Sequence, residues 1–217
     1  MNNFWQLKQK LEQLANLDAT FEIFGAESHG YQSNPCLKDA EIQAFERKYN
    51  IDLPRDYRQF LLEVGNGGAG PGYGLYKILG TGSDNEVAAT PYQNNFDILS
   101  RPFSFTTAWN NLELPVNEYL DNKLLQGALT IANYGCGIYA LLVITGDQKG
   151  QIWIDDRTND SGIYPASLNF CRYFHNFDLD EFLPEGDDDQ PLGFYDWYDN
   201  WLNQSLEQVK QSLVISY

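Results

Sequence analysis

Apolar side chains recur at helical spacing through residues 37–64, which predicts two consecutive amphipathic helices. The two apolar stripes consist of Leu37, Ile42, Phe45 and Tyr49, and then of Tyr57, Phe60, Leu61 and Val64. Between them, Asn50 tolerates the left-handed conformation that ends helices, and the fixed φ of Pro54 suits the first position of a new helix. Gly65 then ends the second helix.

Residues 65–74 hold six glycines and one proline in ten positions, which excludes a helix or a central strand. Part of this run matches the glycine spacing of dinucleotide-binding loops. That spacing binds a pyrophosphate only between a strand and a following helix, whereas here the glycines follow a helix and precede an apolar run. The pattern therefore predicts a tight irregular turn, and a loop that contacts a partner is the alternative.

The remaining pattern predicts helices at both ends of the chain around an antiparallel sheet. Helical periodicity covers residues 3–17 and 193–213. Runs rich in β-branched and aromatic residues, separated by turn residues, predict a meander of strands at residues 128–133, 138–145 and 151–155, with shorter strands at 76–79 and 163–164. The expected fold class is α+β, a single domain with a mainly antiparallel sheet of about five or six strands flanked by helices and a long C-terminal helix.

Charge narrows the class of partner. The chain has 30 acidic and 14 basic residues, a formal net charge of −16 and a pI near 4.3. Such a field repels nucleic acid and anionic membrane surfaces and attracts basic partners. Two interpretations stay open, since the charge can serve solubility alone or speed the encounter with a basic protein.

Catalytic and metal-binding patterns are missing from the sequence. The three cysteines have no paired spacing, and the two histidines form no metal-binding pattern. There is no Gly-x-Ser-x-Gly or Ser-x-x-Lys pattern, no apolar run near the ~18 residues that span a bilayer, and no signal peptide. We expect no metal, no cofactor, no enzymatic activity and a cytoplasmic location.

The chain resembles the SUKH superfamily. The resemblance rests on four features: the helix with the apolar stripe from Leu37 to Tyr49, the Leu53-Pro54-x-x-Tyr57-x-x-Phe60-Leu61 hinge, the Gly67-Gly68 turn and the segment Gly70-Pro71-Gly72-Tyr73-Gly74-Leu75. That superfamily includes bacterial immunity proteins of polymorphic toxin systems and a fungal regulator of cell-wall synthesis. It implies one domain over residues 1–217, with a core at 37–165, a C-terminal helix at 193–213 and residues 1–20 as a helix that is either peripheral or packed on the domain.

The resemblance implies binding to a protein without chemistry. The expected partner is a cognate toxin, basic and nuclease-like, which an immunity protein neutralises by occlusion; the alternative is a regulatory scaffold of cell-wall or signalling proteins. The candidate contact residues are polar groups in loops expected to be exposed: Asn66, Tyr73, Asp155, Asp156, Asp187, Asp188 and Asp189. For the run of three aspartates, a solvated loop and weak cation binding remain alternatives. The oligomeric state is left open.

Overall fold

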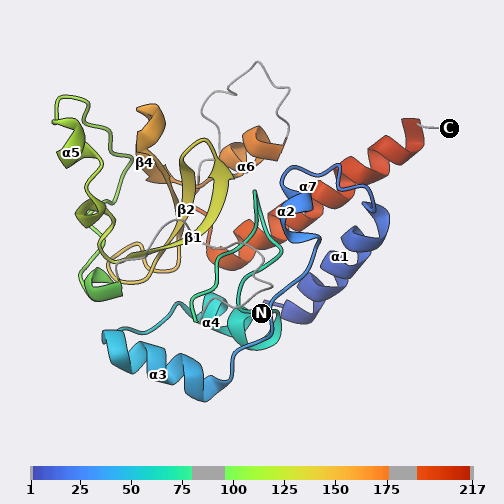
Figure 1. Cartoon of the computed structure of the whole chain (residues 1–217), viewed down its shortest axis with the longest axis horizontal. Helices are drawn as coiled ribbons and strands as arrows, with labels where there is room; N and C mark the ends of the chain where they lie inside the picture. Colours follow the sequence, from blue (N-terminus) through green and yellow to red (C-terminus); the bar gives the residue numbers. More distant parts are fainter. Residues whose placement is uncertain (1, 80–95, 176–189, 216–217) are drawn as a thin grey trace.

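The computed structural model describes residues 2–79, 96–175 and 190–215, and these ranges form an antiparallel sheet flanked by helices (Figure 1). Its helices are α1 (Phe4–Leu17), α2 (Ala26–His29), α3 (Asp39–Tyr49), α4 (Arg55–Glu63), α5 (Val116–Tyr119), α6 (Leu168–His175) and α7 (Phe194–Ile215). Short 3-10 turns are η1 (Phe96–Ile98), η2 (Asn122–Leu125) and η3 (Arg157–Asn159). The strands are β1 (Ala128–Gly135), β2 (Ile138–Val143), β3 (Ile152–Asp156) and β4 (Gly162–Pro165). The predicted α+β class is confirmed.

The sheet is an antiparallel meander in the order β1-β2-β3-β4, as the sequence predicts. The described residues form four strands, so the expected count of five or six is wrong. Residues 76–79 form no strand. The amides of Tyr73 and Tyr76 donate hydrogen bonds to β1, but strand pairing there consists of a single bridge between Leu75 and Ala132. Further single bridges join Gly68 to Leu75 and Ser33 to Gly68, and another joins Trp109 to Ile163 beyond β4. Isolated bridges thus extend the sheet at both edges without making regular strands.

Both faces of the sheet are buried, because apolar residues occupy consecutive positions in β2 and β3. On one face Leu142, Ile152 and Ile154 join the main core with the helices. On the other face Leu141, Val143 and Trp153 form a second cluster under residues 103–125. Successive side chains of a strand point to opposite faces, so this continuous apolar run requires a cover on each side.

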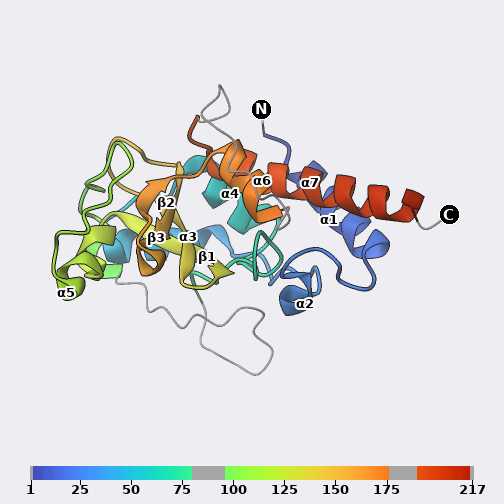
Figure 2. The same ribbon diagram turned by 90° about the horizontal axis from the view of Figure 1, so that it is seen from above.

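Helix α7 packs against α1, α4 and α6 and closes the main core. Its aromatic residues explain this role, since Phe194 and Tyr198 each make edge contacts with Phe60 of α4, at centroid distances of 5.1 and 4.9 Å. Lys10 of α1 forms an ion pair with Asp199 of α7 at 2.5 Å. Figure 2 shows α1 and α7 together at one end of the molecule and α5 at the opposite end.

The local signals for the two central helices are confirmed. Helix α3 ends at Asn50, which has a left-handed φ of 51°, and α4 begins directly after Pro54. The stretch before them differs from expectation, because the polar sequence around His29 predicts a loop, whereas His29 lies buried in the short helix α2.

Candidate protein-binding surface

The glycine-rich loop, residues 65–74, is buried apart from Tyr73, so the alternative of an exposed contact loop is wrong for most of its length. Its backbone forms hydrogen bonds with two neighbouring stretches of the chain. Gly68 and Leu75 exchange two hydrogen bonds at 2.9 and 2.7 Å, and the amide of Ala69 donates to the carbonyl of Gln32 at 2.8 Å. The tight irregular turn expected from the sequence is therefore a packed layer between residues 32–34 and β1.

Glycine is required where this loop meets other backbone. A Cβ on Gly68 would lie 2.4 Å from the carbonyl oxygen of Gln32, and one on Gly72 would lie 2.4 Å from that of Asn133. Both residues also have positive φ, 104° and 60°, which disfavours any L side chain. The density of glycine thus reflects close backbone packing and not a ligand cradle.

The two candidate residues of this loop differ in exposure. Asn66 is buried: its amide group donates to the carbonyl of Leu79 at 2.6 Å and accepts from the amide of Ile78 at 3.1 Å. The expectation that Asn66 is exposed is wrong. Its side chain instead holds the backbone of Ile78 and Leu79, which follow the loop. Tyr73 is 37% exposed and packs against Phe24 at a centroid distance of 5.3 Å.

His29 lies beneath the loop, between Tyr31 and Trp201, with ring centroid distances of 5.4 and 6.0 Å. Its Nδ1 accepts a hydrogen bond from the amide of Tyr31 at 3.1 Å. Burial lowers the pKa of His29 from 6.5 to about 4, because the charged ring would lose its hydration; the backbone of Gly70 opposes part of this shift. The ring is therefore neutral at pH 7.

The depressed pKa of His29 predicts a loss of stability in mild acid. Between pH 6.5 and 4 the unfolded chain takes up the proton before the folded one, so the free energy of unfolding falls as the pH falls. From this residue the total loss is about 3 kcal/mol, and it levels off below the folded pKa of about 4. Denaturant titrations across this range on the wild type and His29→Asn, which retains an acceptor for Tyr31, should give a shallower pH dependence in the variant. Parallel curves would show that His29 does not carry the effect.

Asp155 and Asp156, at the end of β3, are also buried, with 3% and 8% exposure, so the expected exposed acidic pair is wrong. Asp155 binds Arg157 with two parallel hydrogen bonds, from Nε at 2.6 Å and from Nη2 at 2.8 Å. Asp156 points away from this pair and accepts from Asn159 at 2.7 Å and from the hydroxyl of Tyr164 at 3.3 Å. Both carboxylates are thus committed to partners inside the protein.

Arg157 uses its remaining donors to hold the segment around α5. Its Nη1 donates to the carbonyl of Tyr119 at 2.9 Å and to that of Asp121 at 3.1 Å. The Arg157 and Asp155 side chains are 2% and 4% exposed, so the pair is a buried, bidentate anchor between β3 and the end of α5. Sequence reasoning missed this anchor because residues 156–162 have the composition of a polar loop.

A second set of contacts fixes the start of the same segment. Trp109 exchanges two backbone hydrogen bonds of 2.8 Å with Ile163 of β4. The Trp109 ring stacks on Tyr119 at 5.5 Å, and the Tyr119 hydroxyl donates to Asn110 at 2.7 Å. Residues 109–121, which we call the α5 segment, are therefore fastened to the sheet at both ends.

The α5 segment carries exposed apolar side chains. Leu112, Val116 and Leu120 are 59%, 73% and 42% exposed. Val116 and Leu120 lie one helical turn apart, joined by the 3.0 Å hydrogen bond from the Leu120 amide to the Val116 carbonyl. Their four-residue spacing is visible in the sequence, but Trp109, Leu114 and Tyr119 make the same stretch apolar, so the spacing alone does not mark these residues as exposed. We define them as the α5 surface.

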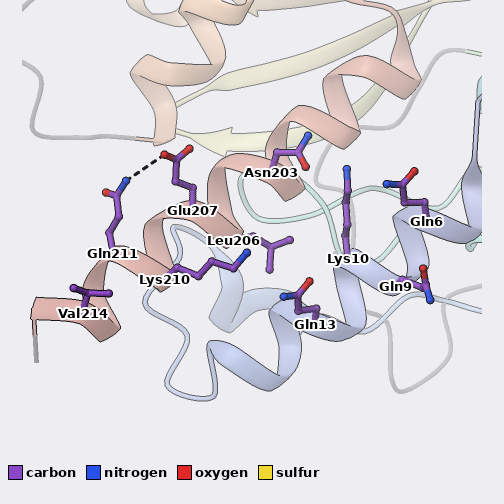
Figure 3. Close-up of a pocket in the computed structure, with 10 residues that line it drawn as sticks. All are labelled: Gln6, Gln9, Lys10, Gln13, Asn203, Leu206, Glu207, Lys210, Gln211 and Val214. Atoms are coloured by element: carbon purple, nitrogen blue, oxygen red, sulfur yellow. Dashed lines mark hydrogen bonds between the residues drawn. The ribbon is translucent and has the colours of Figure 1, made fainter. Parts of the chain in front are cut away.

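The described residues also form an open groove of about 870 Å³ between α1 and α7 (Figure 3). Long side chains of both helices line it, mainly amides and lysines, and Gln211 donates to Glu207 at 3.3 Å across one turn of α7. Of these lysines, Lys10 is already paired with Asp199. The groove contains none of the candidate residues and has the composition of a solvated helix pair.

Metal binding and membrane insertion find no support in the described part of the chain. Within those ranges, no three or more His, Cys, Asp and Glu side chains gather where a metal ion could bind. Over the same residues, no helix combines the length and the apolar character needed to cross a membrane. The candidate residues Asp187, Asp188 and Asp189 lie outside the described residues.

The model of the SMI1 / KNR4 family (SUKH-1) matches residues 36–176, more than half of the chain. The matched range begins before α3 and ends with α6, so it includes the glycine-rich loop, the whole sheet and the α5 segment, and it leaves out α1 and α7. Comparisons with curated proteins and with solved structures gave no match.

Proposed function

Because the chain belongs to the SMI1/KNR4 family (SUKH-1), we propose that it is an immunity protein that binds a cognate toxin and neutralises it by occlusion. The family membership carries the proposal, since the SUKH superfamily includes immunity proteins of polymorphic toxin systems. The mechanism is binding without catalysis, in the cytoplasm of a bacterium.

Charge supports a basic partner. With a formal net charge of −16, the protein attracts a cationic surface and accelerates its encounter with one. A toxin that cleaves nucleic acid needs lysine and arginine residues for phosphate contacts, and an acidic protein seated on those residues would exclude the substrate. We therefore propose a nuclease domain as the target.

We also propose that residues 1–217 act as one domain. The main core contains apolar residues of α1, α4 and α7 together with those of the sheet, including Leu7, Leu61, Ile131 and Leu202. A core shared in this way favours α1 as part of the binding domain and not as a peripheral addition.

The proposal predicts rescue from a toxic partner. The tagged protein serves as bait in a lysate of its own organism, and the captured protein is then produced alone and together with the bait in a laboratory bacterium. We expect the partner alone to arrest growth and co-expression to restore it through a 1:1 complex. We also expect the association rate to fall about tenfold or more between ~0.05 and ~0.5 M salt, because screening weakens the electrostatic attraction.

A harmless partner involved in cell-wall synthesis or signalling would contradict the immunity function and support the regulatory scaffold instead. A toxic partner whose association rate does not change with salt concentration would contradict only the proposed electrostatic attraction and would leave the immunity function standing.

A further inference from the structure

We propose that the α5 surface is the docking site for a basic protein partner, with Leu112, Val116 and Leu120 as its apolar centre. The identity of that partner as a toxin rests on the proposed function, whereas the position of the docking site does not.

Apolar exposure is concentrated in this segment. Three of the eight exposed large apolar side chains among the described residues fall within nine consecutive positions. The other five lie on α1, on α7 and in the region of Phe21 and Tyr73. Single exposed apolar residues are common, but several within one short segment are typical of a contact surface.

The surroundings of this apolar centre are acidic. Glu113 and Glu118 are exposed between its members, and residues 109–121 contain no lysine or arginine; Asp121, which follows directly, pairs with Lys123 at 3.6 Å and adds no net charge. Exposed Asp160 adds to this charge, since its carbonyl accepts a hydrogen bond from Asn110 at 2.6 Å. An apolar centre with an acidic rim complements a basic surface with an apolar projection.

Charge also argues against a second copy of this chain as the occupant. Two copies would bring like-charged rims together, and each would carry a net charge of −16. Like charges brought together at an interface repel each other, so a symmetric contact through this surface is disfavoured.

The backbone beneath the surface is preorganised. Arg157 binds the carbonyls of Tyr119 and Asp121 at one end of the α5 segment, and the Trp109 bridge with Ile163 holds the other end. A surface already held in place loses little conformational entropy when a partner binds. Rigid support under exposed apolar side chains is the arrangement expected of a binding site and not of a loop tip.

The location leaves the surface accessible. Figures 1 and 2 both place α5 at one end of the molecule, away from the C-terminal end of α7. Occupancy of this end would leave the α1–α7 groove uncovered.

Site-specific photo-crosslinking locates the contact even while the partner is unidentified. The photoreactive residue p-benzoylphenylalanine replaces Val116 in one full-length variant, and Leu213 or Trp5 in two controls that are also exposed. We expect one basic protein to crosslink at position 116 and not at the control positions. Absence of a crosslink at 116, a crosslink to a second copy, or an equal yield at the controls would overturn the docking site.

Affinity then tests the contact itself. Val116→Arg places a positive charge against a basic partner, and Leu213→Arg is the matched control on α7. We expect the dissociation constant of the crosslinked partner to rise at least 30-fold for Val116→Arg and less than threefold for Leu213→Arg. Val116 is 73% exposed, so unchanged melting temperatures should accompany both substitutions. Equal affinities of the two variants would overturn the inference.

The two proposals fail separately. A toxin that this protein neutralises, but that crosslinks only at the control positions, overturns the docking site and leaves the immunity function standing. A harmless basic protein at position 116 supports the docking site and overturns the immunity function.

Discussion

Arg157→Leu is expected to lower the free energy of unfolding by about 3–5 kcal/mol, because it leaves the Asp155 carboxylate buried without a counter-charge. Arg157 also donates side-chain hydrogen bonds to the carbonyls of Tyr119 and Asp121, which the variant loses. The variant should therefore unfold at a lower denaturant concentration than the wild type. Relative to the wild type, hydrogen exchange should accelerate more at the amides of the α5 segment than at those of the sheet.

The matched control is Lys123→Leu. Lys123 pairs with Asp121 at 3.6 Å, but its side chain is 80% exposed. Removal of an exposed pair costs about 0–1 kcal/mol. A double variant, Asp155→Leu with Arg157→Leu, removes both charges and should recover part of the loss. If Arg157→Leu were no more harmful than Lys123→Leu, the pair would not be the anchor of this segment.

Gly68→Ala is the second large effect, with an expected loss of about 2–5 kcal/mol. The positive φ of 104° disfavours alanine by about 1–2 kcal/mol. The added Cβ would meet the backbone of Gln32 at 2.4 Å, and overpacking of this kind typically costs a further ~1–3 kcal/mol. Because the obstacle is backbone, a rotamer change cannot relieve it. Equilibrium unfolding in urea measures the difference.

Gly30→Ala separates the two causes. Gly30 also has a positive φ, 51°, but an added Cβ would find its nearest neighbour, the ring of Phe21, at 4.0 Å. The free energy of unfolding of Gly30→Ala should therefore fall only by the ~1–2 kcal/mol that the positive φ costs an alanine. Equal losses for Gly30→Ala and Gly68→Ala would show that the close packing of the loop adds nothing.

Local signals predicted the boundary between α3 and α4 well. Asn50 and Pro54 act within one turn of their own positions, so the ends of α3 and α4 follow from the local sequence, independently of the rest of the fold. The meander of strands could also be predicted from the sequence, because turn residues separate its strands. The expected strand count was too high, because the apolar run at residues 76–79 has the pattern of a strand, whereas this part of the chain joins the sheet only through the single bridge at Leu75.

The candidate contact residues were harder to predict for a physical reason. Polar residues in loops are usually exposed, but Asn66 and Asp155 satisfy their hydrogen bonds internally, and this permits their burial. The partner of Asp155 is only two residues away, in a 3-10 turn that no sequence pattern indicated. Conversely, the exposed apolar residues of the α5 segment have the composition of a core, so sequence alone could not place them at the surface.

The pairing of α1 with α7 has a consequence for synthesis of the protein. Residues 18–193 separate the two helices along the chain, yet α7 provides more of the packing of α1 than α4 does. At ribosomal rates of ~5–20 residues per second, α1 waits roughly 10–35 s for its partner. During that time Phe4, Leu7, Leu11 and Leu14 lack the part of their cover that α7 provides in the finished protein. The nascent chain should therefore be a substrate for chaperones at its first helix, and slow translation should favour its aggregation.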